Sequence, residues 1–219
     1  MLCSRFPAEN QGDTMADEQR LSRAIEDYIA GAEHFLLLVS EVSPEQWDRP
    51  GLGDWSVRSL IGHTSRSLTT VADYLAQPEP DTVEIDSVAG YYARIQGLAS
   101  SPEVTSRGVA AGVDLGDDPL RAAVERRDRA VAAITGIADR PVATPWGGIL
   151  LSHYLPTRTF ELAVHGLDIA RAIGSASTLP RKVLASALAT AVGAAELTGQ
   201  GEQALLILTG RGQGPISVV

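Results

Sequence analysis

Glu161 and His165 stand four residues apart in the stretch 158–171, Arg-Thr-Phe-Glu-Leu-Ala-Val-His-Gly-Leu-Asp-Ile-Ala-Arg. In an α-helix this spacing places both side chains on one face. A carboxylate and an imidazole that converge are two ligands of a metal site. His63, about a hundred residues earlier in the apolar-patterned stretch 56–75, supplies a third candidate ligand. Three protein ligands with an open fourth position are typical of catalytic zinc.

A plainer interpretation is open for the same residues. Glu161 and His165 can form an ordinary ion pair, and His63 can be a core histidine held by one hydrogen bond. The surrounding residues favour the metal site. The helix expected here is apolar on nearly every side, and Arg158, Glu161, His165 and Asp168 form one polar stripe through it. Buried charge is costly unless it is paired or bound to a metal.

Length and composition exclude several classes of function. The 219 residues contain no internal repeat and suit one domain with a substantial core. A net charge of -9 without basic clusters argues against a nucleic-acid or anionic-membrane partner. The longest apolar runs are far shorter than the roughly 18 residues of a membrane span. Cys3 is the only cysteine and no signal-peptide pattern is present, so we expect a reducing, cytoplasmic setting.

The apolar spacing predicts an all-α fold, an antiparallel helical bundle with extra short helices. We expect a disordered leader over 1–16, the bundle over 17–200 and a short C-terminal extension over 201–219. The expected helices are 17–40, a short turn over 44–48, 57–75, 87–99, 119–138, 151–173 and 180–198. The stretch 102–116 is ambiguous, 140–148 is a connection, and 204–208 is a strand or a helical cap.

Four aromatic or imidazole residues lie near this pattern. Trp55 and Trp146 stand in the loops that lead into the two motif helices, where they can wall a pocket or simply pack. His34 borders the apolar face of the first helix, and His153 lies near the start of the later one. We assign His34 a structural role and His153 a capping or surface role.

The stretch 52–63, Leu-Gly-Asp-Trp-Ser-Val-Arg-Ser-Leu-Ile-Gly-His, and the stretch 158–171 together resemble the mycothiol-dependent maleylpyruvate isomerase family. That family belongs to the DinB-like metal-binding bundles, and the similarity runs from about residue 21 to 219. The resemblance implies a DinB-like four-helix bundle that holds a divalent metal, usually zinc, through His63, Glu161 and His165. It also implies mycothiol as a co-substrate. Isomerases of the family carry a further C-terminal domain, whereas about twenty residues follow the bundle here.

The chemistry implied by this resemblance starts from a metal-bound thiol, which coordination converts to a thiolate. The thiolate adds to an electron-poor double bond of an unsaturated diacid, the new single bond rotates, and elimination gives the other isomer. Transfer of the thiol to an electrophile shares the first step. We expect Arg158 to hold a substrate carboxylate and Asp168 to orient His165 or an outer water. The plainer interpretation is that Arg158 and Asp168 only pair with neighbours.

Two other functions remain open at this point. Water in place of the thiol would make the site a metal-dependent hydrolase. A degenerate or structural site would leave a non-catalytic metal-binding bundle. The expected partners are a small-molecule thiol and a small electrophilic substrate, with no nucleic acid and no membrane. A homodimer is left open as the assembly.

Overall fold

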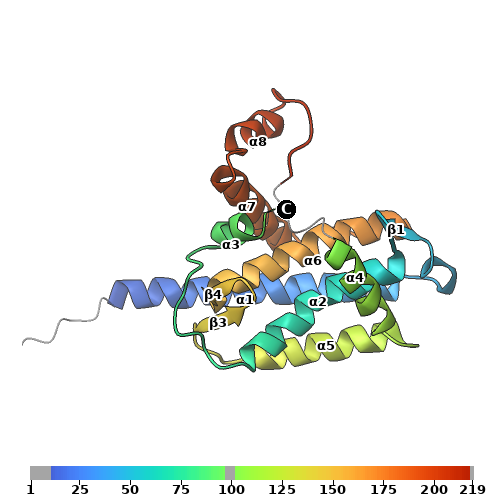
Figure 1. Cartoon of the computed structure of the whole chain (residues 1–219), viewed down its shortest axis with the longest axis horizontal. Helices are drawn as coiled ribbons and strands as arrows, with labels where there is room; N and C mark the ends of the chain where they lie inside the picture. The colour runs from blue at the N-terminus through green and yellow to red at the C-terminus, as the bar shows by residue number, and fades with distance from the viewer. Residues whose placement is uncertain (1–10, 97–101, 218–219) are drawn as a thin grey trace, which may run out of the picture.

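The computed structural model describes residues 11–96 and 102–217, and it is mostly helical (Figure 1). The helices are α1 (Gln11–Ser40), α2 (Val57–Leu75), α3 (Val88–Ile95), α4 (Pro102–Val113), α5 (Pro119–Ile134), α6 (Leu151–Ile173), α7 (Arg181–Leu197) and α8 (Gly201–Leu208). A 3₁₀ turn covers Pro44–Gln46, and two small antiparallel hairpins pair β1 (Pro50–Leu52) with β2 (Trp55–Ser56) and β3 (Pro141–Thr144) with β4 (Gly147–Leu150). The predicted all-α class is confirmed.

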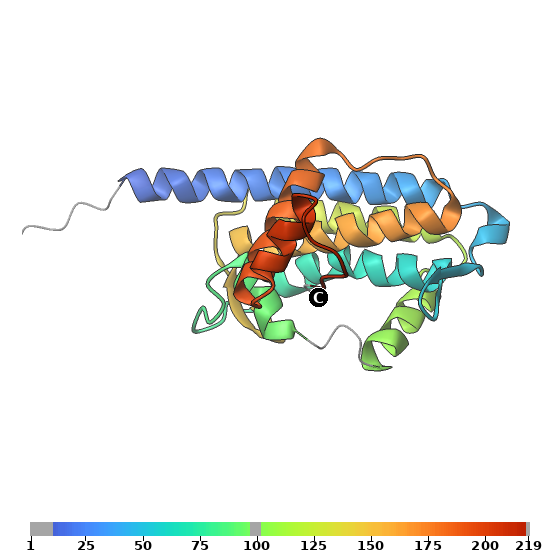
Figure 2. The same ribbon diagram turned by 90° about the horizontal axis from the view of Figure 1, so that it is seen from above.

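Four long helices form the bundle. Helix α1 contacts α5 and α6, and α2 contacts the same two helices, which closes a ring around one hydrophobic core (Figures 1 and 2). This is the DinB-like arrangement. Within the described ranges, no helix is long and apolar enough to cross a membrane.

The directions of the helices differ in part from the antiparallel prediction. Helices α2 and α5 run parallel, because Arg126 donates to Ser65 and Arg129 pairs with Asp73 further along both helices. Helices α1 and α6 are also parallel, whereas α2 runs against α6 (Figure 1). The reason is the long connection between α2 and α5, which carries the chain back to the other end of the bundle before α5 begins. Of the four neighbouring pairs, α1 with α6 and α2 with α5 are therefore parallel, whereas α1 with α5 and α2 with α6 are antiparallel.

Several predicted boundaries are confirmed by their caps. The Ser56 hydroxyl accepts a hydrogen bond from the Ser59 amide at 3.2 Å at the start of α2. The Asp118 carboxylate accepts one from the Arg121 amide at 3.0 Å at the start of α5. Helix α6 begins and ends at the predicted residues, and Gly174 closes it with a left-handed φ of 73°. Local cap chemistry therefore determines these ends.

Other boundaries were wrong. Helix α1 begins at Gln11, so residues 11–16 are helical and Asp17 is not its N-cap, while residues 1–10 lie outside the described chain. A helix that already exists gains one hydrogen bond for each added residue, which favours this backward extension. Helix α3 ends at Ile95 and α5 at Ile134, earlier than expected. The ambiguous stretch 102–116 is helical over 102–113. For 204–208 the helical alternative is confirmed, since these residues lie in α8. The connection predicted over 140–148 forms most of the β3–β4 hairpin.

Helix α4 presses on the part of α2 that leads to the site. A Cβ atom added to Gly62 would lie 2.2 Å from the Gly112 amide nitrogen of α4. A Cβ atom added to Gly108 would lie 2.4 Å from the Trp55 ring. Both contacts require glycine, because backbone or a large ring occupies the space. Glycine therefore lets α4 approach close enough to hold Trp55 in place.

Candidate metal centre

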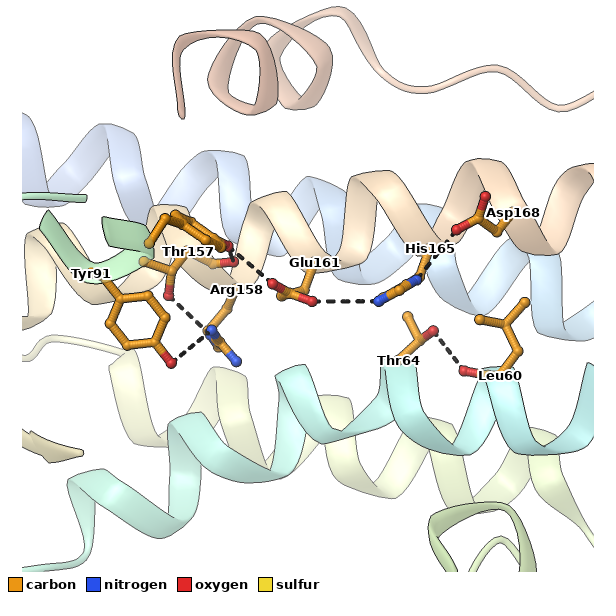
Figure 3. A network of polar contacts seen from close by, with 9 residues as sticks. Leu60, Thr64, Tyr91, Thr157, Arg158, Glu161, His165 and Asp168 are labelled. Carbon is orange, nitrogen blue, oxygen red and sulfur yellow. Dashed lines mark hydrogen bonds and ion pairs between the residues drawn. The ribbon is translucent and has the colours of Figure 1, made fainter. Parts of the chain in front are cut away.

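His63 of α2 and the pair Glu161 and His165 of α6 meet in the bundle. One possible ligand atom from each residue lies within 4.8 Å of the other two. His165 Nε2 is 3.4 Å from Glu161 Oε2 (Figure 3). The His63 and His165 rings are 5.1 Å apart between centroids, in an edge-on arrangement. The structure therefore brings together the three residues that the sequence singled out as ligands.

Helix geometry explains the meeting. Glu161 and His165 share a face of α6 through their four-residue spacing. On α2, the fully buried Leu60 marks the face of the helix that points into the bundle. His63 follows three residues later, about one turn, on the same face. The Trp55 ring stacks on His63 at 4.5 Å between centroids, and its Nε1 donates to the Thr105 carbonyl of α4 at 3.0 Å. The Trp55 ring, itself held by α4, therefore positions the His63 ring.

A second layer of polar contacts orients the two α6 residues. The Tyr92 hydroxyl of α3 donates to Glu161 Oε1 at 3.0 Å, which leaves Oε2 toward His165. On the other side, His165 Nδ1 lies 3.3 Å from Asp168 Oδ2, which leaves Nε2 toward Glu161 (Figure 3). Sequence reasoning assigned such an orienting role to Asp168 but missed Tyr92. The available signal was a tyrosine at a buried helical position, since its hydroxyl needs a partner there.

The charges at the site follow from burial and from these contacts. Burial raises the pKa of Glu161, but the hydrogen bond with His165 and the charge of Arg158 outweigh it and lower the pKa to about 2. Burial lowers the pKa of His165, but hydrogen bonds to Asp168 and Glu161 raise it to about 9. Burial and the neighbouring His165 lower the pKa of His63 to about 4. These shifts favour a charged pair of Glu161 and His165 beside a neutral His63, and a metal that takes His165 as a ligand would displace its proton.

The three side chains open onto a cavity of about 460 Å³. Both predicted tryptophans, Trp55 and Trp146, line it. Among the described residues of the wall, three arginines carry positive charge and one carboxylate, that of Glu161, carries negative charge. The arginines are Arg66, Arg107 and Arg158. In a chain with a net charge of -9, this wall is a local excess of positive charge that suits an anion.

Arg158 has a fixed place in this wall. Its guanidinium lies over the rings of Tyr91 and Tyr154, at 5.5 and 5.2 Å from their centroids. Its Nε donates to Thr157 Oγ1 at 3.0 Å, and a terminal nitrogen lies 3.3 Å from the Tyr91 hydroxyl (Figure 3). Asp168 is placed differently. It contacts His165 and Arg171 and is not part of the cavity wall.

The other two histidines lie away from the three candidate ligands. His34 is buried, and its Nε2 is 3.3 Å from the Ser177 hydroxyl. This contact suits the structural role assigned to it. His153 is half-buried and lines a wider, more open groove of about 940 Å³ between α1, α6, α7 and the start of α3. That groove contains none of the three candidate ligands, although it is the larger hollow.

The donor set suits a metal such as zinc. Two imidazoles and one carboxylate are common zinc ligands, and three protein ligands leave a position for a further molecule. The Nδ1 atom of His63 is buried and has no hydrogen-bond partner within the described ranges. Contacts of the kind made by Tyr92 and Asp168 usually orient metal ligands. The cavity beside the three residues gives room for a small molecule.

Comparison with known proteins agrees with this geometry. No curated protein and no solved structure matches the chain. A family model described as Mycothiol maleylpyruvate isomerase N-terminal domain matches residues 29–170. The match spans well over half of the 219 residues and contains His63, Glu161 and His165. The chain therefore belongs to the family of mycothiol maleylpyruvate isomerase N-terminal domains.

Proposed function

We propose that the protein binds one divalent metal ion, preferably zinc, through His63, Glu161 and His165. We further propose that it uses mycothiol, a low-molecular-weight thiol, to isomerise a small electrophilic substrate or to transfer sulfur to it. The observation that carries the proposal is the convergence of three donor atoms within 4.8 Å on the wall of a cationic cavity. Family membership supports the same chemistry.

The chain's own residues prepare the site for such a metal. Tyr92 and Asp168 hold the outer atoms of Glu161 and His165, so that the inner atoms face one another. His63 is neutral at pH 7 and has a free lone pair for a metal. When bound, the metal would hold a thiol as its thiolate and so supply a nucleophile at neutral pH.

Arg158 is the residue that we assign to the substrate. Its planar group is held by Thr157 and by two tyrosine rings, which suits it to bind a carboxylate in one orientation. A carboxylate fixed there would place the adjacent double bond of an unsaturated acid inside the cavity. Sulfur forms a bond to the β-carbon while the π electrons move toward the acid group. Rotation about the carbon–carbon bond, now single, and expulsion of the thiolate then regenerate the double bond in the other geometry, and no atom is gained or lost.

Thiol transfer ends after the first of these steps. The C–S bond then remains in the product, and a proton completes the α-carbon. We place the reaction in the cytoplasm, where a low-molecular-weight thiol is kept reduced. A hydrolytic or a non-catalytic site would use the same three ligands, so experiment has to separate these functions.

Metal content tests the ligand assignment. We expect about one divalent ion per chain in the purified protein, and its loss in His63→Ala and in His165→Ala. His153→Ala is the matched control, because His153 is half-buried but lies outside the ligand cluster. Retention of metal by both ligand variants would show the assignment to be wrong.

Cobalt substitution tests the thiol. Addition of mycothiol to the cobalt-loaded protein should produce an intense near-ultraviolet band from sulfur-to-metal charge transfer. Glu161→Ala should weaken both cobalt binding and the band. If cobalt loads normally and millimolar thiol produces no band, thiol chemistry is excluded, and a hydrolytic or non-catalytic function takes its place.

A further inference from the structure

Helix α7 has a second apolar face that the bundle does not cover. Its inner face is buried through Val183, Ala187 and Ala194. On the outer face, Leu184, Leu188 and Val192 are 42%, 47% and 46% exposed. These positions follow one another at a spacing of four residues, so the three side chains form one stripe along the helix. We call this stripe, with the charged residues at its two ends, the outer stripe of α7.

The two ends of the outer stripe carry opposite charges. Arg181 precedes Leu188 by two helical turns, and Glu196 follows it by slightly more than two turns. Both are exposed, and neither makes an ion pair with another described residue. This placement is unfavourable for an isolated helix, because a cation stands at the positive N-terminus and an anion at the negative C-terminus.

We propose that the outer stripe of α7 is a homodimer interface, on which a second copy of this chain lays its own α7 in the opposite direction. The twofold axis passes through Leu188. Leu188 then meets Leu188 of the partner subunit, and Leu184 faces the partner's Val192. Arg181 faces the partner's Glu196. Arg181 also lies beside the negative C-terminal end of the partner's α7, and Glu196 beside its positive N-terminal end. These interactions offset the unfavourable position of each charge on its own helix.

A second copy is the occupant that this pattern fits. A twofold interface requires a surface that is complementary to itself when reversed, and the outer stripe reads nearly the same in both directions from Leu188. Ala185 and Ala189 flank it and are small enough to let two helices approach closely. Helix α8, which extends beyond α7 in Figure 1, adds the exposed Leu205 and Leu208 at 63% and 64%. These contribute further apolar area near one end of the stripe.

The proposed dimer leaves the metal cavity accessible. No residue of α7 or α8 is part of the described wall of that cavity. The inference therefore does not depend on the proposed chemistry. A pair of single helices buries less surface than a permanent dimer, so we expect a weak dimer with a dissociation constant on the order of 10 μM.

Sedimentation velocity between about 1 and 500 μM tests the interface. The wild-type chain should pass from monomer to dimer over this range. Leu188→Glu places two carboxylates against each other on the axis and should weaken dimerisation at least about tenfold. Leu37→Glu is the matched control, because Leu37 is equally exposed, at 48%, on α1. A wild-type chain that stays monomeric at every concentration overturns the proposal and leaves the stripe to a different partner.

Charge exchange and cross-linking test the orientation. Arg181→Glu should weaken the dimer about fivefold, and the double variant Arg181→Glu with Glu196→Arg should restore it. In a Cys3→Ser background, Leu188→Cys should form a disulfide with itself under mild oxidation. Leu184→Cys should do so only when it is mixed with Val192→Cys. Efficient self-linking of Leu184→Cys, or a dimer that survives Leu188→Glu, would contradict the antiparallel arrangement.

Discussion

Tyr92→Phe tests whether the contact between α3 and Glu161 prepares the metal site. The substitution removes one hydroxyl and keeps the ring, which packs edge-on against Phe160 with centroids 5.0 Å apart. The Tyr92 hydroxyl lies 3.0 Å from Glu161 Oε1 and 3.0 Å from the Thr157 carbonyl. It has one hydrogen to donate, and the charged carboxylate is the stronger acceptor. The variant therefore frees the outer oxygen of Glu161 while the core stays filled.

The magnitude follows from burial and charge. Tyr92 is 1% exposed, so water does not easily replace the lost hydroxyl. A hydrogen bond to a charged group contributes about 1.5–3 kcal/mol. If this contact holds Glu161 in its ligand geometry, we expect metal affinity to fall about 10- to 100-fold.

Competition with a chromophoric zinc chelator measures this loss. Tyr28→Phe is the control, because the Tyr28 hydroxyl donates to the Ser67 carbonyl at 3.0 Å and is equally buried. Tyr28→Phe should lose about 1 kcal/mol of stability and Tyr92→Phe about 1.5–3 kcal/mol, but only Tyr92→Phe should lose metal affinity. The reasoning is refuted if Tyr92→Phe binds zinc within about twofold of wild type, or if Tyr28→Phe loses as much affinity.

Three further predictions concern stability. Gly62→Ala should lower the free energy of unfolding in urea by about 3 kcal/mol, because the new Cβ atom would lie 2.2 Å from the backbone of α4. Gly31→Ala is its control and should be neutral or stabilising, because no atom would lie nearer than 3.6 Å to its Cβ atom. Saturating zinc should raise the melting temperature of wild type, equivalent to about 2.7 kcal/mol at a hundredfold excess over the dissociation constant, and this increase should vanish in His63→Ala. Burial lowers the pKa of His34, His63 and His153 below 6.5, so the unfolded chain takes up protons first and stability should fall as the pH drops from 6.5 toward 5. His34→Gln should make stability less dependent on pH between 6.5 and 5. An unchanged pH dependence would contradict the conclusion that burial lowers the pKa of His34.

The local features of this protein were predictable from sequence. The bounds of α6, the cap at Ser56 and the shared face of Glu161 and His165 all depend on residues within about one helical turn of each other. For the same reason, the motif residues were enough to indicate the family. The prediction failed at the start of α1, where no local signal opposed further helix, and at the β3–β4 hairpin, which contacts Ile85 far away in the chain.

Only the tertiary structure decided which distant residues complete the site. Tyr92 reaches Glu161, and Arg66 and Arg107 join the cavity wall, because α2 and α3 pack against α6 and α4 packs against α2. Asp168 lies outside the wall although it belongs to the same polar stripe, because its carboxylate reaches the far side of the His165 ring. Helix periodicity gives the face on which a residue lies, but the packing of whole helices decides what that face meets.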